Sequence, residues 1–238
     1  MKKIIAPWQS LLLLMILVIA ASCQKQNAAS PIKKEKYFEL SGFTKITAGE
    51  NFTVNVIRSK NFSVKAIGSM DDLLDLGLKV EEGQLNIKYN RIKLTREKIE
   101  LLITVPVIDK FQLYAAAKGS VTGFQDQSTL MNTVLTGFSN ASLSGAGMQV
   151  SINVSGNSIL SLSGNTESLN GSLSGSGQLH AYGLNAKEAK VNAAENGKAY
   201  IMPTYVLFAN VSGNGQVFYK GDPSTHVEIN DNGQVIQE

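Results

Sequence analysis

The side chains that most often carry out chemistry in proteins are few and scattered in this sequence. It holds two histidines, His180 and His226, and one cysteine, Cys23. A zinc site needs three or four His, Cys or acidic ligands gathered at one point, and the two histidines lie 46 residues apart. We therefore expect two surface histidines, no metal ion and no cofactor.

The densest acidic group consists of Asp71, Asp72 and Asp75. Three carboxylates so close in sequence could bind a cation. They also fall at the start of a short predicted helix over 71–76, with Asp71 as its N-cap and Gly77 as its stop. Carboxylates at that position stabilise the free backbone N–H groups and the helix dipole, so we favour a structural role.

A pair of carboxylates for glycoside hydrolysis is missing from the middle of the sequence. Such an enzyme needs two acidic groups flanking one sugar bond. Between Ala141 and Ala186 the only charged side chain is Glu167. Serines are many, but no His and Asp accompany one in sequence. We therefore predict a protein that is not an enzyme, and a carbohydrate-active enzyme is the third of our three hypotheses.

Three tyrosines recur at intervals that match a longer repeat. Tyr182, Tyr200 and Tyr219 are 18 and 19 residues apart. If each repeat forms one coil of a stacked structure, the three rings line one face as a ladder. Aromatic rings offer a large contact area with a polar tip and are enriched at binding surfaces. We predict a binding face for a glycan or a protein; packing at coil corners or inside the core is the alternative.

The interval comes from a seven-residue phrase that returns through the second half of the chain. Each phrase has small or apolar residues at its ends and mostly Gly, Asn, Ser or Ala between them. The phrase starts at Ala115, Leu135, Val154, Leu173, Ala193, Val211 and Ile229, with spacings of 20, 19, 19, 20, 18 and 18 residues. A period this short over half of a chain is typical of a β-helix or solenoid. Calcium bound coil by coil is not expected, because only the last phrase carries an Asp on its turn, Asp231.

The residues between the phrases alternate between apolar and polar. Val150 and Ile152, for example, are interleaved with Ser151 and Asn153. This period of two predicts half-buried strands, and Gly and Asn in the phrase predict tight turns because they tolerate positive φ. We expect an all-β, right-handed β-helix or solenoid over 111–238, with coils of about 19 residues. The alternative, a disordered Gly/Ser/Asn linker, would lack the alternating apolar residues.

The preceding segment, residues 37–110, has longer alternating stretches and more charge. These stretches stand at 52–56, 62–66, 85–89 and 101–105. Hairpin turns are expected at 59–61 and 81–84. We predict an antiparallel or mixed β region that stacks on the solenoid and covers its first coil, because exposed coil ends are unpaired sheet edges. By the same argument, the phrase 229–235 leaves an edge that could pair with another copy in a homo-oligomer.

Residues 1–22 have the character of a secretion signal, with Lys2 and Lys3 before a long apolar run. The run is shorter than the roughly 20 apolar residues that span a membrane. The stretch IAASC, which ends at Cys23, resembles a bacterial lipobox. This resemblance implies cleavage before Cys23 and lipidation of that cysteine; an ordinary signal peptide with an incidental cysteine is the alternative. Residues 23–36 then form a polar, lipidated tether.

The order of motifs extends the resemblance. A lipoprotein leader precedes GFTKITAGENFTVNV and MDDLLDLGLKVEEGQLNI, and ELLITVPVIDKFQL leads into phrases such as SGSG and SGNG. This order resembles the head GIN domain family of auto-transporter adhesins, which is frequent in Bacteroidetes. The resemblance covers about residues 38–220 and implies a right-handed β-helical fold without catalytic residues to carry over. The chain departs from the family pattern in its first phrase, which reads AAAKG.

Charge limits the partners that the protein can have. The formal net charge is +3, and Lys2 and Lys3 supply two of these charges within the leader, so no nucleic-acid partner is expected. We predict an outer-membrane lipoprotein that faces the periplasm or the cell surface; Gln24 after the cysteine resembles this sorting. Its expected partners are the membrane, through the lipid anchor, and a glycan or protein ligand bound by a non-enzymatic adhesion module. A structural or accessory envelope protein without its own ligand is the second hypothesis.

Overall fold

The computed structural model describes residues 33–145 and 147–238, which belong to one compact unit, Lys33–Glu238. The predicted secretion signal, Cys23 and most of the predicted tether lie outside the described residues. Within the described ranges, no helix is long and apolar enough to cross a membrane.

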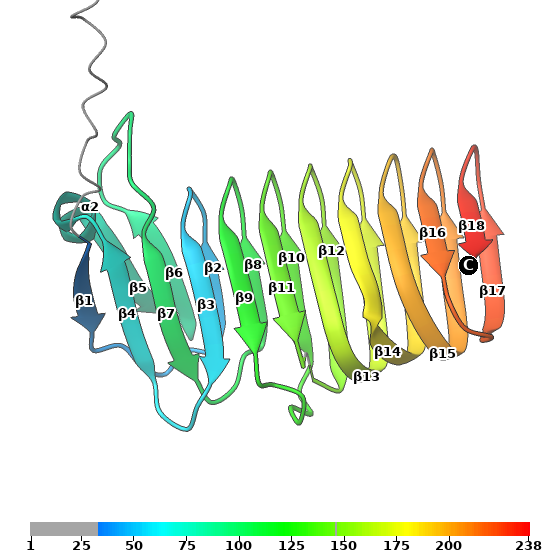
Figure 1. Cartoon of the computed structure of the whole chain (residues 1–238), viewed down its shortest axis with the longest axis horizontal. Helices are drawn as coiled ribbons and strands as arrows, with labels where there is room; N and C mark the ends of the chain where they lie inside the picture. Colours follow the sequence, from blue (N-terminus) through cyan, green and yellow to red (C-terminus); the bar gives the residue numbers. More distant parts are fainter. Residues whose placement is uncertain (1–32, 146) are drawn as a thin grey trace, which may run out of the picture. The chain divides into compact units, whose positions relative to one another are not determined.

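The described unit is almost entirely β-structure (Figure 1). Its one described helix is α2 (Met70–Asp75). The strands are β1 (Lys34–Phe38), β2 (Lys45–Ala48), β3 (Thr53–Arg58), β4 (Ser63–Gly68), β5 (Leu76–Glu81), β6 (Gln84–Tyr89), β7 (Glu100–Val105), β8 (Lys110–Leu113), β9 (Lys118–Thr122), β10 (Met131–Leu135), β11 (Asn140–Ser144), β12 (Gln149–Val154), β13 (Ile159–Leu173), β14 (Gln178–Ala193), β15 (Lys198–Val211), β16 (Gln216–Tyr219), β17 (Ser224–Ile229) and β18 (Gln234–Gln237).

Two parallel ladders run through the unit and form two faces. Face A consists of β6, β2, β8, β10 and β12, the C-terminal parts of β13, β14 and β15, and β17. Face B consists of β7, β3, β9 and β11, the N-terminal parts of β13, β14 and β15, and then β16 and β18. Val154 pairs with Leu173, Leu173 with Ala193, and Ala193 with Val211, so successive coils are 19, 20 and 18 residues long. The predicted solenoid is confirmed.

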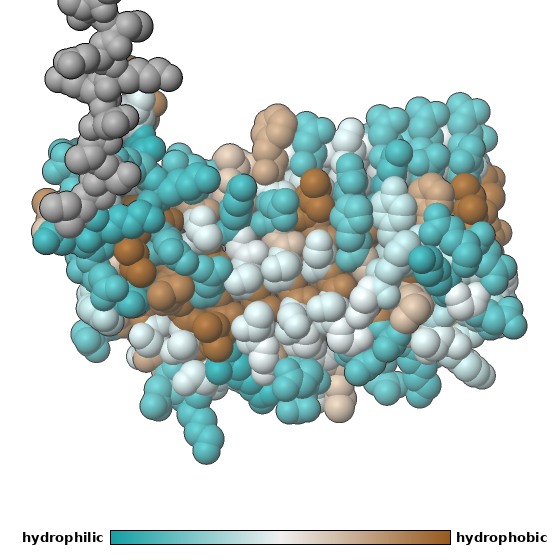
Figure 2. Space-filling view, viewed as in Figure 1, coloured by the Kyte–Doolittle hydropathy of each residue, from teal (hydrophilic) through white to brown (hydrophobic). Residues whose placement is uncertain are grey.

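The alternation read from the sequence becomes an inside and an outside. In β12, Val150, Ile152 and Val154 are buried, whereas Gln149 and Asn153 are exposed. Stacked coils bring the inward residues into one continuous core, and full burial of each such aliphatic side chain stabilises the fold by about 1.5–3 kcal/mol. Figure 2 shows polar side chains along the edges of the unit and a narrow band of apolar atoms between them.

Each coil passes from face A to face B through a corner residue with positive φ. The corner residues are Glu50, Ala115, Gly137, Gly156, Gly175, Glu195, Gly213 and Asp231, with φ between 54° and 79°. Backbone hydrogen bonds join successive corners, for example from Asn157 N to the Gly137 carbonyl at 2.7 Å and from Ser176 N to the Gly156 carbonyl at 2.8 Å. The predicted tight turns are therefore stacked one on another.

The first repeated phrase begins two residues earlier than the sequence suggested. Leu113 pairs with Leu135, so the first phrase starts at Leu113 and not at Ala115. Ala115 itself occupies the corner, at φ 56°. The run of three alanines contains no glycine to mark the turn, which explains the error. Ala48 pairs with Leu113 in turn, so another corner, at Glu50, precedes all of the phrases found in the sequence.

The chain doubles back before it enters the regular coils. β2 lies between β6 and β8 on face A, and β3 lies between β7 and β9 on face B. β4 pairs antiparallel with β7, β1 pairs antiparallel with β4, and β5 pairs antiparallel with β6. This mixed region matches the predicted one. At the opposite end, β17 and β18 each pair with one described neighbour, β15 and β16; association of copies through this edge stays a prediction.

Two local predictions within this region need correction and one is confirmed. The turn at 59–61 does not form a hairpin, because β7 lies between β3 and β4. The turn at 81–84 does join the hairpin of β5 and β6, and Glu82 and Gly83 both have positive φ. The N-cap of α2 is Ser69 and not Asp71: the Ser69 hydroxyl accepts a hydrogen bond from Asp72 N. Ser stabilises a helix start in the same way as Asp, so composition alone did not decide between them.

The geometry of the corners predicts that one substitution destabilises the fold and that another stabilises it. A Cβ on Gly177 would lie 2.4 Å from the Val154 carbonyl oxygen, so Gly177→Ala should lower the free energy of unfolding by about 2 kcal/mol or more. Ala115 pays for positive φ, and Ala115→Gly should raise the free energy of unfolding by up to about 1 kcal/mol. Urea denaturation of both variants measures these changes; equal destabilisation by the two would contradict the prediction.

Candidate functional site

The tyrosines predicted to form a ladder are divided by the register of the strands. Tyr200 pairs with His180 on one side and with Phe218 on the other. The three rings form a stack on face B, with centroid distances of 5.1 Å and 5.0 Å and interplanar angles of 5° and 9°. We call His180, Tyr200 and Phe218 the aromatic stack.

Tyr182 lies beside this stack. Its ring meets Tyr200 edge-on at 5.7 Å, its hydroxyl donates to a Glu238 carboxylate oxygen at 2.7 Å, and Lys220 Nζ lies 4.4 Å from the ring centroid. Burial raises the pKa of the Tyr182 hydroxyl, and the hydrogen bond to Glu238 raises it further. Tyr219 pairs with Ile201 and packs partly against the core. The three tyrosines therefore do not form one ladder.

The neighbouring rings of the stack cover both faces of the Tyr200 ring, which are the surfaces on which a sugar ring would stack. His180 and Phe218 lie parallel to Tyr200 on its two sides, so that Tyr200 presents its edges to solvent. Stacked aromatic pairs across neighbouring strands stabilise a sheet. The geometry thus gives Tyr200 a structural role, whereas Tyr182 keeps an exposed polar tip toward Glu238.

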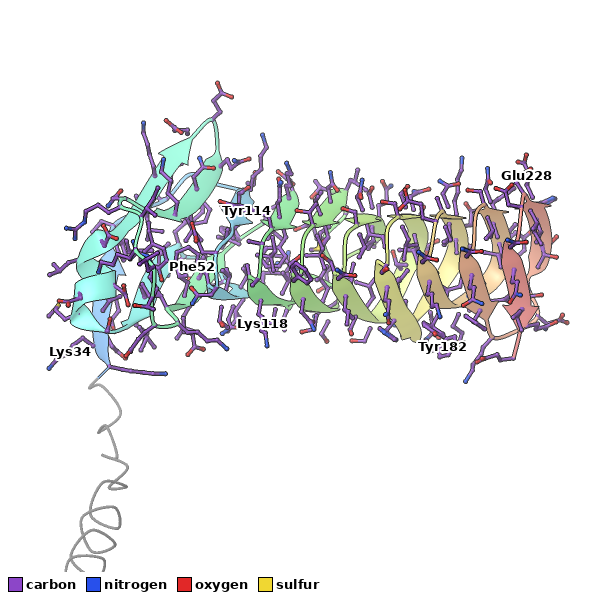
Figure 3. All side chains as sticks on the ribbon, turned by 90° about the horizontal axis from the view of Figure 1, so that it is seen from above. Lys34, Phe52, Tyr114, Lys118, Tyr182 and Glu228 are labelled. Carbon is purple, nitrogen blue, oxygen red and sulfur yellow. The ribbon has the colours of Figure 1, made fainter. Side chains whose placement is uncertain are left out.

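A second aromatic pair lies on face A, away from the three tyrosines. Phe208 and His226 stack at 4.8 Å with an interplanar angle of 12°. A surface groove runs past them, which we call the Phe208 groove. Its lining residues are Lys190, Asn192, Phe208, Ala209, Asn210, His226, Val227 and Glu228. Figure 3 places Tyr182 and Glu228 on opposite sides of the unit, so the two aromatic groups face in different directions.

The Phe208 groove combines an apolar platform with hydrogen-bonding groups. Asn192 pairs with Asn210 and Asn210 with Glu228, so one amide row runs beside the row of Lys190, Phe208 and His226. Phe208 is 43% exposed. Aromatic rings beside amide, basic and acidic side chains suit recognition of a polar ligand with an apolar face. The 18-residue interval between Phe208 and His226 is the signal in the sequence that could have revealed this pair.

The groove does not offer the carboxylate pair that glycoside hydrolysis requires. Among the described residues that line it, Glu228 is the only carboxylate, and two are needed. Over residues 33–145 and 147–238, no three His, Cys, Asp or Glu side chains are grouped so as to hold a metal ion.

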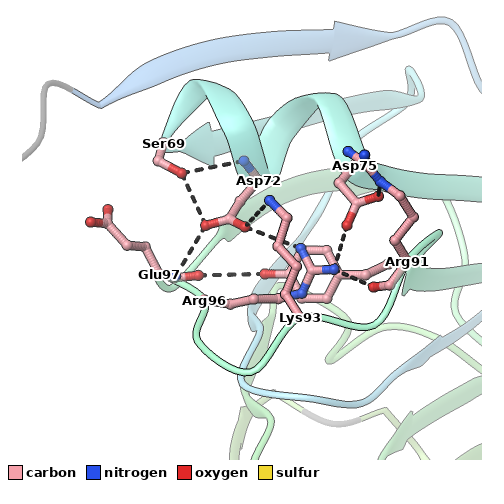
Figure 4. Close-up of polar contacts among 8 residues, drawn as sticks. Ser69, Asp72, Asp75, Arg91, Lys93, Arg96 and Glu97 are labelled. Carbon is pink, nitrogen blue, oxygen red and sulfur yellow. Dashed lines mark hydrogen bonds and ion pairs between the residues drawn. The ribbon is translucent and has the colours of Figure 1, made fainter.

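The acidic group at α2 is part of a buried ion network instead of an open cation site (Figure 4). One Asp72 carboxylate oxygen accepts from Glu97 N and the Ser69 hydroxyl, each at 3.0 Å, and the other lies 3.1 Å from Arg96 Nη1. Asp75 accepts from Arg91 Nε at 2.9 Å and also pairs with Arg96. The structural role that we favoured is supported for Asp72 and Asp75, although their partners come from the loop 90–99 as well as from the helix.

Each group in this network shifts the titration of its neighbours. Burial acts to raise the pKa of Asp72, but hydrogen bonds from Glu97 N, Ser69 and Arg96 outweigh it and hold the pKa below 3.8. The hydrogen bond from Arg91 lowers the pKa of Asp75, and Arg96 lowers it further. The Arg96 guanidinium lies 3.6 Å from the centre of the Tyr89 ring, and burial raises the pKa of Tyr89 to about 12.

A family model described as "Putative auto-transporter adhesin, head GIN domain" matches residues 42–223. A "putative adhesin" from Bacteroides fragilis has a similar structure, with a TM-score of 0.75 and 17% identity; the match covers 87% of this chain and 97% of the other. A "putative lipid binding protein" from Parabacteroides distasonis matches with a TM-score of 0.67 and 17% identity over 87% and 96% of the two chains. At this identity the likenesses show the fold. None of the curated proteins compared with this chain matches it.

The ion network predicts how the free energy of unfolding changes when Arg96 is replaced and when the pH is lowered. Arg96→Met should lower the free energy of unfolding at neutral pH by about 1 to 3 kcal/mol, because buried Asp72 loses a charged donor. The pKa values of Asp72 and Asp75 in the folded protein lie below the ordinary value of 3.8. The two carboxylates therefore stabilise the native protein fully at pH values above 3.8, and this stabilisation is lost as the pH falls through their folded pKa values. Urea denaturation at neutral and acidic pH should therefore show a shallower acid dependence for the variant.

The control for this prediction is Lys79→Met. Lys79 pairs with Glu81 at 2.5 Å, but both side chains are more than half exposed, and such surface pairs contribute little. If Arg96→Met changed stability no more than Lys79→Met, the network would not hold the loop to the helix.

Proposed function

The chain belongs to the head GIN domain family of putative auto-transporter adhesins, and on this premise we propose that it is a lipid-anchored protein of the cell envelope that binds a glycan or protein surface without catalysing a reaction. The family match spans residues 42–223, which is most of the chain. The observation that carries the binding role is the Phe208 groove, in which the stacked Phe208 and His226 lie beside the polar row of Asn192, Asn210 and Glu228. The lone carboxylate among its described lining residues favours binding over hydrolysis.

Cys23 is the proposed anchor. It follows an apolar leader directly and is the only cysteine of the chain. Acylation of this residue would hold the protein at the outer membrane, on the periplasmic side or at the cell surface, because several acyl chains give stable membrane binding where one does not. Residues between Cys23 and β1 would act as the tether.

Tyr182, Tyr200 and Tyr219 form the second candidate surface. On this surface the Tyr182 hydroxyl lies beside Glu238, and Lys220 lies over the Tyr182 ring on face B. The covered ring faces of Tyr200 favour edge contacts with a protein over stacking with a sugar. A structural or accessory envelope role without a ligand is the alternative, and it is favoured if neither surface retains a partner.

The anchor is tested with Cys23→Ser in cells. We expect the native chain to incorporate a radioactive fatty acid and to sediment with membranes, whereas the variant should lose both properties, because serine lacks the thiol that carries the diacylglycerol through a thioether. Ser30→Ala is the matched control in the predicted tether and should behave as the native chain. Sedimentation of Cys23→Ser with membranes at the native level would refute lipid anchoring at this residue.

The binding face is tested with a glycan array and with whole cells, using the soluble chain from Gln24 onward, which keeps every described residue. Phe208→Ala should weaken retention at least about tenfold, because loss of a central aromatic contact costs about 1.4 kcal/mol or more. Phe138→Ala, which removes an aromatic ring that is 70% exposed elsewhere, is the control.

The same assay separates the two surfaces. Weakening by Tyr182→Ala and Tyr200→Ala, with Phe208→Ala unaffected, would move the binding role to face B. Retention by no glycan and no cell surface, with folding confirmed by circular dichroism, would favour the structural role.

A further inference from the structure

The loop between β6 and β7, residues 90–99, exposes two aliphatic side chains completely. Ile92 and Leu94 have relative exposures of 102% and 104%, the highest of any large hydrophobic side chain in the described residues. Water solvates such side chains unfavourably, and two together on one projecting loop indicate a surface that meets an apolar environment. The binding function proposed above does not use them.

The residue before each of these side chains, Arg91 or Lys93, is held toward α2. Arg91 Nε lies 2.9 Å from an Asp75 carboxylate oxygen, and Lys93 Nζ lies 3.6 Å from Asp72. Asn90 N donates to the Asp75 carbonyl at 2.9 Å, and Glu97 N donates to Asp72 at 3.0 Å. The ion pairs thus hold Arg91 and Lys93 against α2, and Ile92 and Leu94, which follow them in the loop, lie fully in solvent.

The helix adds apolar side chains at the same end. Met70 and Leu74 are 53% and 66% exposed, and residues four apart share one face of a helix. Exposed charged residues accompany them at the start of β1, on α2 and β6 and in the loop: the lysines Lys33, Lys34, Lys88 and Lys98, with the acidic residues Glu35, Asp71 and Glu97 among them. Apolar side chains with lysines around them suit the interface of a bilayer, where aliphatic groups enter the acyl boundary and ammonium groups meet phosphate.

The chain reaches this end directly from the proposed anchor. Lys34 pairs with Gly68, one residue before the N-cap of α2, and Lys36 Nζ donates to the Leu73 carbonyl at 3.2 Å. Nine residues separate Cys23 from Lys33, and the ten Cα–Cα steps between them span at most about 35 Å. A lipid on Cys23 would therefore keep α2 and the loop 90–99 at a high local concentration near the bilayer, so that even weak insertion is sufficient.

We propose that Met70, Leu74, Ile92 and Leu94 form a membrane-docking face that lies on the lipid surface. The proposal rests on the envelope location proposed above. It explains why aliphatic side chains are exposed at the end of the unit where the chain enters. Docking here orients the stack of coils so that the Phe208 groove, which β14, β15 and β17 build at the opposite end of the stack, is presented away from the membrane.

The test uses tryptophan as a reporter. Trp8 is the only tryptophan of the sequence and precedes Cys23, so the chain from Cys23 onward contains none. This chain keeps every described residue; made without the leader, it carries a free Cys23 thiol that couples to a maleimide phospholipid in vesicles of phosphatidylethanolamine and phosphatidylglycerol. Leu94→Trp then reports on the loop. Tyr205→Trp, at a side chain 68% exposed on β15, is the matched control.

Brominated phospholipids quench tryptophan that enters the acyl region. We expect quenching of Leu94→Trp to be at least about twofold stronger than that of Tyr205→Trp, because docked apolar side chains lie roughly 5–10 Å below the headgroups. Adding Ile92→Asp should reduce the quenching to the control level, while circular dichroism stays unchanged, since Ile92 makes no core contact.

Equal quenching at Leu94→Trp and Tyr205→Trp would overturn the docking face. Capture of a protein partner by the loop, with no quenching by brominated lipid, would assign the same side chains to a protein contact and would also refute the proposal. Chemical coupling makes these outcomes independent of whether Cys23 is acylated in cells, which Cys23→Ser tests separately.

Discussion

The rest of the fold depends on the superposition of one corner in every coil. At this corner the backbone takes positive φ, and an amide just after it donates to the corner carbonyl of the previous coil, as Asn157 N does to Gly137. At two of the three acidic corners the side chain adds a further bond: Glu195 accepts from Gly175 N at 2.5 Å and Asp231 accepts from Gly213 N at 3.2 Å. These bonds offset the cost of positive φ for a side chain with a Cβ. Because the corners are aligned, each inward-facing residue packs on the residue at the same position of the next coil, and these residues form the continuous core.

The same register builds the outer surfaces. Side chains at equivalent positions of neighbouring coils stand about 4.8 Å apart, so like groups form rows. Asparagines do so at the corner, where Asn232 Nδ2 donates to Asn214 Oδ1 at 3.3 Å, and aromatic rings do so at His180, Tyr200 and Phe218. Rows of this kind stiffen a face, but they also cover ring faces. Phe208 has an aromatic ring on one side only, that of His226, and it lies beside the amides of face A, so it is better placed for a ligand than Tyr200.

The two ends of the stack are built differently. The first end is closed by antiparallel strands and by α2, and its buried aspartates fix the loop 90–99 against the helix. At the other end, Val227 and Ile229 remain 45% and 47% exposed although they continue inward-facing rows of the core. The closed end is therefore held by charged contacts between loop and helix, and the regular coils supply repeated surface. The proposed functions divide along the same line.

The sequence alone determined the architecture, because the period of the phrase and the alternation between phrases are local properties of the chain. Register was decided by the tertiary structure. The register of β14 and β15 up to Ala181 places Tyr200 opposite His180, and the shift that follows Ala181 leaves Tyr182 without a partner in β15. The similar spacing of the tyrosines therefore did not make them a ladder. The three alanines at 115–117 hid a corner that only strand pairing reveals. Asp72 and Arg96 are 24 residues apart, and no local pattern joins them; they meet because the loop after β6 folds back over α2. Local pattern fixes which residues point inward, whereas the partner of each outward residue depends on how whole coils stack.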